Sequence, residues 1–120
     1  MKKVLIVDDS DTIRRQVAAA LRSNFAVLEA ANGVDGLACA GANVDLSLIL
    51  LDLNMPLLNG VDMLEQLKSD LRTREIPVLM LTTEAEPSLI DRAKRAGASG
   101  WIVKPVKPDM LASAAVRVAR

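Results

Sequence analysis

Short apolar runs alternate with longer segments of helical periodicity along the whole chain. The apolar runs predict five strands, at Lys3–Val7, Phe25–Glu29, Leu46–Leu51, Ile76–Leu81 and Trp101–Val103. Segments with apolar residues at helical spacing predict five helices, at Asp11–Arg22, Gly33–Ala40, Asn59–Ser69, Pro87–Ala96 and Asp109–Ala119. The chain therefore reads as a βα unit repeated five times.

The first, third and fourth predicted strands are continuously apolar rather than alternating. This pattern is typical of parallel strands that are buried on both faces. Right-handed crossovers would then place helices on both sides of the sheet. We therefore expect an α/β fold, a doubly wound parallel sheet of five strands. With 120 residues and no linker or repeat, residues 1–120 are expected to form a single domain.

Composition narrows the classes of function. Fifteen basic residues balance fifteen acidic ones, and Phe25 and Trp101 are the only aromatics, so nucleic-acid recognition by this chain alone is not expected. The absence of histidine excludes histidine general bases and histidine metal ligands. No apolar run has membrane-spanning length, and the one after Met1 stops at Asp8, too early for a signal peptide. A cytoplasmic protein without membrane contacts is expected.

Polar residues follow four of the predicted strands. They are Asp8-Asp9, Asp52, Thr82-Thr83 and Lys104-Pro105. Because the carboxyl ends of parallel strands share one edge of a sheet, these residues should converge there. Three carboxylates repel one another, and Lys104 together with Mg²⁺ would compensate their charge. The alternative is that each aspartate only caps a helix or shapes a turn.

This combination of residue types suits phosphoryl transfer. A lysine and a metal ion can neutralise the transferring group, and an aspartate can act as the nucleophile. The sequence has no GxxxxGK[ST] or GxGxxG loop, so the chain is not expected to hold a nucleotide donor. The phosphoryl donor should therefore come from elsewhere.

Four segments in order carry a resemblance to a known family. They are Val7–Ser10, Leu51–Gly60, Leu81–Ala85 and Gly97–Pro105. The chain resembles the receiver domain of two-component response regulators from Lys3 to about Ala119, and is most similar to the single-domain chemotaxis (CheY-like) regulators. The resemblance implies a flavodoxin-like (βα)5 fold with strand order 2-1-3-4-5.

The resemblance also implies a phosphorylation site. Asp52 would be the phospho-acceptor, and Mg²⁺ would be held by Asp8, Asp9, Asp52 and the backbone carbonyl of Asn54. Lys104 would pair with Asp52 and then with the phosphoryl group, through a segment in which Lys104-Pro105 is a cis peptide. The chain is expected to catalyse only its own phosphoryl transfer and autodephosphorylation, and so not to be an enzyme.

A switch would follow phosphorylation in such a receiver. The Thr82 hydroxyl would turn toward the phosphate, and Trp101 would turn inward behind the moving loop. Asn54, Thr83 and Glu84 would flank the phosphate. Thr83 stands where the family usually keeps Ala or Gly and could narrow access to the site, whereas Asn54 and Glu84 match the chemotaxis type. The lifetime of the phosphorylated form stays open.

The implied partners are a sensor histidine kinase and an output protein such as a flagellar motor switch component. The chain cannot carry the phosphohistidine itself, because it has no histidine. Residues 85–120 contain seven basic and three acidic residues, a net charge of +4, and residues 1–84 a net charge of −4. The face formed by the fourth helix, fifth strand and fifth helix would thus favour an acidic or amphipathic partner. Alternatively, these charges only solvate a helix.

The sequence is also compatible with other functions. The chain could be a receiver excised from a larger response regulator, a phosphate sink, or a phosphate-independent pseudo-receiver that serves as an interaction module. Asp9 and Asp11 resemble the DxDx[TV] signature of haloacid-dehalogenase-like phosphatases, but Ile13 occupies the Thr or Val position. A flavodoxin is disfavoured because Asp8-Asp9 would repel the phosphate of FMN.

Overall fold

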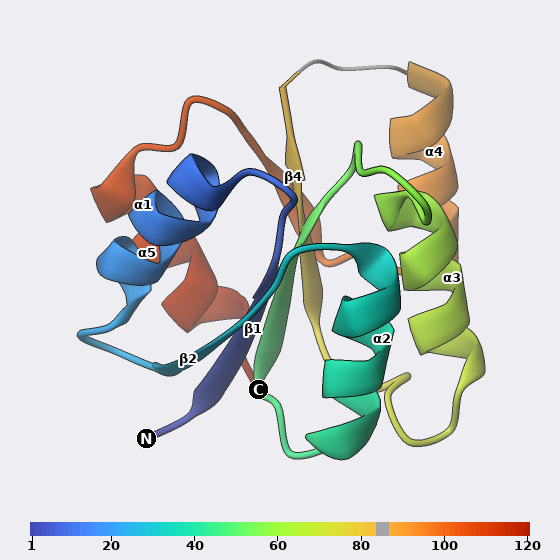
Figure 1. The fold of residues 1–120 in the computed structure, drawn as a ribbon, viewed down its shortest axis with the longest axis horizontal. Coiled ribbons are helices and arrows are strands. Elements are labelled where there is room, and N and C mark those ends of the chain that lie inside the picture. Colours follow the sequence, from blue (N-terminus) through green and yellow to red (C-terminus); the bar gives the residue numbers. More distant parts are fainter. Residues whose placement is uncertain (84–86) are drawn as a thin grey trace.

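A computed structural model describes residues 1–83 and 87–120 as five βα units (Figure 1). The strands are β1 (Lys3–Val7), β2 (Ala26–Ala30), β3 (Leu48–Asp52), β4 (Val78–Thr82) and β5 (Gly100–Val103). The helices are α1 (Asp11–Leu21), α2 (Gly33–Ala42), α3 (Gly60–Ser69), α4 (Pro87–Ala96) and α5 (Pro108–Val118). In this part of the chain, no helix has the length and apolar character needed to cross a bilayer.

All five strands are parallel and lie in the order β2-β1-β3-β4-β5, which confirms the expected fold. The register aligns the ends of the central strands. Val7 of β1 pairs with Leu51 of β3, and Asp52 follows at the next position, paired with Leu81 of β4. The carboxyl ends of these strands consequently form one edge of the sheet.

The sheet separates two apolar cores, which explains the continuously apolar strands. Helices α1 and α5 cover one face, and α2, α3 and α4 cover the other (Figure 1). Within β1, Val4 and Ile6 face the α1–α5 side, whereas Leu5 and Val7 face the opposite core. Side chains of successive strand residues point to opposite faces, so each strand needs apolar residues at every position when both faces are covered.

The strand boundaries differ from the predicted ones in a regular way. Leu46 and Ile76 are fully buried but precede β3 and β4, because they pack into the core without joining the ladder. At the other end, Asp52 and Thr82 belong to the strands rather than following them. Apolar patterning reports burial, whereas a strand is defined by its hydrogen-bonded partners, so the two sets of limits need not coincide.

Three helices on the site edge begin with side-chain caps. The side-chain oxygens of Ser10, Asn32 and Asn59 accept the backbone N–H groups of residues three positions later, at the starts of α1, α2 and α3. These caps satisfy backbone donors that a helix leaves unpaired at its first turn. Asn59 thus caps α3 rather than forming its first residue, and the loop after Asp52 is thereby fixed at its far end.

Leu57 in this loop is strained, and relieving the strain should stabilise the protein. Its φ is 71°, the one positive value at a non-glycine position within the described ranges, and its side chain is 85% exposed. Because asparagine tolerates this backbone region better than leucine, Leu57→Asn should raise the free energy of unfolding by about 0.5–1 kcal/mol. Urea denaturation checks this against Leu71→Asn, because Leu71 is also strongly exposed, at 75%, but has no positive φ. An equal change in both variants would contradict the explanation by backbone strain.

Candidate functional site

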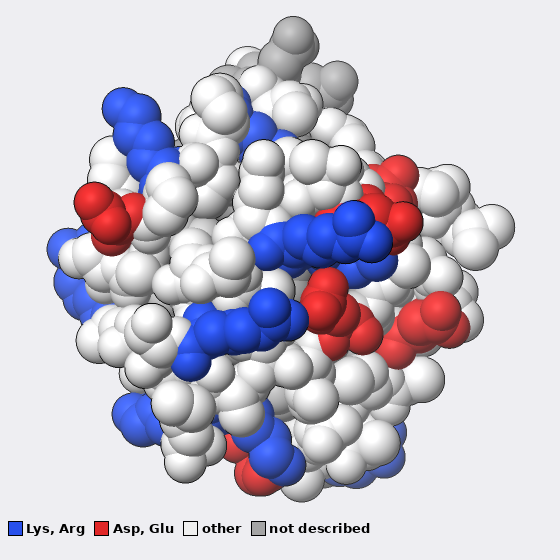
Figure 2. Space-filling model, turned by 60° about the vertical axis from the view of Figure 1, so that its left-hand side comes forward, with Lys and Arg blue, Asp and Glu red and all other residues white. Residues whose placement is uncertain are grey.

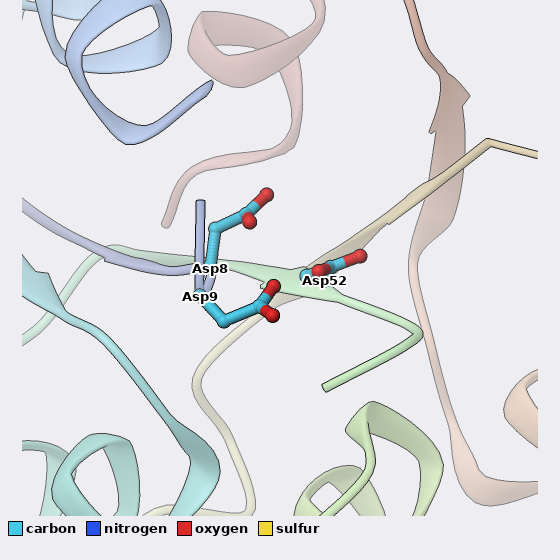
Figure 3. A group of neighbouring side chains, drawn as sticks. All are labelled: Asp8, Asp9 and Asp52. Carbon is cyan, nitrogen blue, oxygen red and sulfur yellow. The ribbon is translucent and has the colours of Figure 1, made fainter. Parts of the chain in front are cut away.

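Three carboxylates meet at the carboxyl edge of the sheet. Asp8 and Asp9 follow β1, Asp52 ends β3, and one oxygen of each lies within 4.8 Å of the others. Figure 3 shows the three side chains directed into the same region from these two neighbouring strands. Asp8 and Asp52 are buried and Asp9 is exposed, so the cluster opens to solvent on the Asp9 side. Three anionic oxygens at this spacing suit a hard divalent cation such as Mg²⁺.

Lys104 brings the fourth charge into the cluster. Its Nζ lies 2.9 Å from Asp8 Oδ2 and 3.2 Å from Asp52 Oδ1, and the side chain is only 10% exposed. The ion pair with Asp52 agrees with the sequence-based expectation, and the shorter ion pair with Asp8 adds to it. The Lys104-Pro105 peptide is cis, as expected. One lysine against three carboxylates leaves the cluster with excess negative charge.

The burial and the charge of this cluster change the pKa of Asp52. Burial, followed by the neighbouring charge of Asp8, raises the pKa of Asp52 to about 6, although Lys104 acts in the opposite direction. Burial lowers the pKa of Lys104, but its contacts with Asp8 and Asp52 outweigh this and hold that pKa above its ordinary value. Lys104 is therefore cationic at neutral pH, and Asp52 gains from any further positive charge nearby.

Thr82 lies at the adjacent strand end. It is the last residue of β4, its side chain is buried, and its backbone carbonyl accepts the N–H of Lys104 at 2.7 Å. Thr83 follows it at the exposed surface. Glu84 lies outside the described residues. The pairing of β4 with β5 and this hydrogen bond together hold the Thr82 backbone close to Lys104.

Asn54 lies on the other side of Asp52. Asn54 is exposed, and its backbone N–H donates to Asp52 Oδ1 in a long hydrogen bond of 3.4 Å. Asp52 Oδ1 thus faces both this N–H and Lys104 Nζ. The structure thus brings Asn54 beside the Asp52 carboxylate.

Sequence reasoning missed the residues that hold Asp8. The backbone N–H of Ser10 donates to Asp8 Oδ1 at 2.9 Å, and Arg14 Nη1 donates to the Asp8 carbonyl at 2.7 Å. Ser10 could have been found from its place directly after the aspartate pair, since short-range bonds of this type are common in turns. Arg14 gave no such signal, because an arginine near the start of a helix usually lies in solvent.

Trp101 lies away from the carboxylates, on the outer part of β5. It is 36% exposed, and Lys94 Nζ of α4 lies 4.9 Å from the centroid of its ring. This distance allows a cation–π contact. The tryptophan is thus turned outward, with a lysine of the neighbouring helix beside it.

Comparison with known proteins shows which family the chain resembles. Residues 4–116 match the model of the response regulator receiver domain. The chain is 41% identical over 111 residues to the chemotaxis protein CheY1 of Helicobacter pylori, covering 91% of this chain and 90% of that protein. It is 36% identical to the rice two-component response regulator ORR11, over 88% of this chain and 73% of that protein. The crystal structure of Vibrio cholerae CheY4 superposes with a TM-score of 0.92 at 38% identity, covering 98% of each chain.

Proposed function

Because this chain belongs to the response regulator receiver family, we propose that it accepts a phosphoryl group on Asp52 from a phosphohistidine of a sensor kinase. The observation that carries the proposal is the environment of Asp52, a buried carboxylate beside one lysine and two further carboxylates at an open sheet edge. A bond would form between an Asp52 oxygen and phosphorus while the bond from phosphorus to the donor's imidazole nitrogen breaks. The imidazole leaves, and an acyl phosphate remains on Asp52.

The side chains of the cluster would have distinct parts in this step. Asp52 must be ionised to attack, and Lys104 stays cationic beside it to balance the charge of the incoming phosphoryl group. Asp8, Asp9 and Asp52, with the backbone carbonyl of Asn54, would hold Mg²⁺. When bound, Mg²⁺ supplies positive charge to the phosphoryl oxygens. Asp9, exposed at the rim, lies on the side from which solvent and donor would approach.

The Thr82 hydroxyl would bind the phosphoryl oxygens after transfer and so begin the switch. The buried Thr82 ends the strand next to Asp52, and Lys104 is hydrogen-bonded to its backbone, which supports this role. Thr83 is exposed beside it and would narrow the access of water to the phosphate. Phosphorylation adds a dianion that biases a two-state equilibrium rather than creating a new state.

The output surface would be formed by α4, β5 and α5. A groove of about 490 Å³ runs along β5 and α5, where apolar Trp101, Val103 and Met110 lie beside the cations Lys107 and Arg117. On the α1–α5 side, seen in Figure 2, basic side chains are separated by uncharged surface and lie near acidic ones. In the groove along β5 and α5, two cations beside apolar side chains favour an acidic amphipathic segment as the partner. Given relatives named as chemotaxis proteins, we propose a flagellar motor switch component as partner, in the cytoplasm.

Intact mass after incubation with acetyl phosphate tests the chemistry directly. We expect one phosphoryl adduct per chain in the presence of Mg²⁺, none with a chelator, and none in Asp52→Asn. Asp35→Asn is the matched control, because this exposed aspartate lies outside the cluster and should leave the adduct unchanged. No adduct in the wild type, together with no binding of beryllofluoride, would replace the proposal by a phosphate-independent interaction module.

Trp101 should report the switch as a change in fluorescence. Turning inward would bury the ring and remove it from Lys94, so both the intensity and the wavelength of its emission should change on phosphorylation. As Trp101 is the only tryptophan, emission during titration with acetyl phosphate or beryllofluoride gives an unambiguous signal. Asp52→Asn should show no change. An unaltered spectrum in protein that mass spectrometry shows to be phosphorylated would argue against the rotation.

A further inference from the structure

Arg14 is a largely buried cation directly behind the carboxylate cluster. It lies in the first turn of α1, and its side chain is only 15% exposed. Nη1 donates to the backbone carbonyl of Asp8 at 2.7 Å, and Nε donates to Glu29 Oε1 of β2 at 3.3 Å. Nη2 contacts Asp11 Oδ1. One guanidinium thus joins the end of β1, the start of α1 and the neighbouring edge strand.

Arg14 is one of several groups that hold Asp8, whose backbone N–H also donates to the Ala30 carbonyl at 3.2 Å. Ser10 N–H binds Oδ1, Lys104 Nζ binds Oδ2, and Arg14 binds the carbonyl oxygen. That carbonyl belongs to the peptide that joins Asp8 to Asp9. Arg14 therefore fixes the orientation of the peptide from which Asp9 projects.

Asp9 needs such support more than the other two aspartates. Within residues 1–83 and 87–120, no hydrogen bond or ion pair holds its side chain, and the residue is exposed. Its carboxylate can only be kept near Asp8 and Asp52 through its backbone. Loss of a group that orients a metal ligand from behind typically weakens metal binding by about tenfold to a hundredfold.

We propose that Arg14 is a positioning residue for the cation site, and that it acts by fixing the Asp8–Asp9 peptide so that the Asp9 carboxylate faces the cluster. This inference rests on the proposed binding of Mg²⁺ to Asp8, Asp9 and Asp52. Arg14 touches no reacting atom in this proposal.

Charge and positioning predict opposite results when Arg14 is replaced. Arg14 is positive and lies next to the site, so a purely electrostatic role would disfavour Mg²⁺, and its removal would tighten binding. A positioning role predicts weaker binding after removal, even though the site becomes more negative. The sign of the change in affinity therefore identifies the role.

Titration calorimetry of the full chain with Mg²⁺ provides the test. We expect Arg14→Gln to weaken binding roughly tenfold. Arg14→Lys should also weaken binding, since a single ammonium group keeps the charge but cannot reach Asp8 and Glu29 together as the planar guanidinium does. Arg15→Gln, the same change at the exposed neighbouring position of α1, is the control and should bind as the wild type. Circular dichroism at the titration temperature confirms folding, and Arg14→Lys serves as the test if Arg14→Gln does not fold.

A double-mutant cycle with Asp9→Asn links the effect to its target. Once the Asp9 carboxylate is gone, Arg14→Gln should weaken Mg²⁺ binding little further, whereas general destabilisation of the fold would persist in both backgrounds. Unchanged or tighter binding by Arg14→Gln, beside normal binding by the wild type, would overturn this inference alone. No binding by the wild type would instead overturn the proposed cation site and the role of Arg14 with it.

Discussion

Gly60→Ala is expected to lower the free energy of unfolding by about 3 kcal/mol or more. A Cβ at this position would lie 2.1 Å from the carbonyl oxygen of Asp52 and 2.9 Å from Cα of Leu53. Both obstacles are backbone atoms, so no side chain can rotate away, and the start of α3 must move from the end of β3. The Gly60 N–H also donates to the Leu53 carbonyl at 3.0 Å, and this movement would break that bond.

Chemical denaturation measures the loss, and Gly41→Ala is the matched control. Gly41 lies in α2, and the nearest atoms to a Cβ there belong to the Arg72 guanidinium, at 3.6 Å and beyond. Alanine is the better helix former, so this variant should be unchanged or slightly more stable. If Gly60→Ala still folds, displacement of Asp52 should reduce the acetyl phosphate adduct. Wild-type stability and wild-type phosphorylation together would contradict the close approach of these backbone segments.

The sequence predicts the part of the site that follows from the geometry of a parallel sheet. Asp8, Asp52, Thr82 and Lys104 each end or follow a predicted strand, and parallel strands bring such residues to one edge whatever their separation in sequence. Periodicity alone could not order the strands. The order 2-1-3-4-5 came from the family resemblance, and the observed sheet confirms it.

What the sequence could not supply were contacts set by tertiary packing. That Lys104 lies nearer to Asp8 than to Asp52 depends on the relative heights of three strand ends. Arg14 meets Glu29 only because β2 lies beside β1 at the edge of the sheet. The close approach of Gly60 to Asp52 likewise arises from how tightly the loop turns back, for which a glycine in a sequence is only a weak sign.

The second large effect concerns the charge of Asp52 itself. Asp52→Asn should raise the free energy of unfolding of the metal-free protein at pH 7–8 by about 1–3 kcal/mol. Burial, and then repulsion from Asp8, raises the pKa of Asp52 from 3.8 to about 6, so the folded state holds this carboxylate in its ionised form at a cost. Asparagine keeps the shape without the charge, and Lys104 retains its pair with Asp8.

The pH dependence distinguishes this explanation from a change in packing. The pKa of Asp52 is higher in the folded state, so its contribution to stability is full below about pH 3.8 and is lost as the pH rises through about 6. The advantage of Asp52→Asn should consequently shrink as the pH falls from 8 to 5. Urea denaturation in the presence of a chelator, at pH 5, 6, 7 and 8, measures it. Asp45→Asn is the control, because Lys3 lowers the pKa of this exposed carboxyl and its replacement should bring no gain.

Added Mg²⁺ should narrow or reverse the difference in stability between the two proteins. A cation that binds only the folded state stabilises it by an amount that grows with its concentration, and Asp52→Asn loses one of the proposed ligands. The wild type should therefore gain more from Mg²⁺ than the variant does, and the difference at pH 7–8 should narrow or change sign. If Asp52→Asn were instead less stable than the wild type in chelator at pH 8, the ion pair between Lys104 and Asp52 would outweigh the repulsion among the carboxylates. The excess negative charge would then not be what draws a cation to this edge of the sheet.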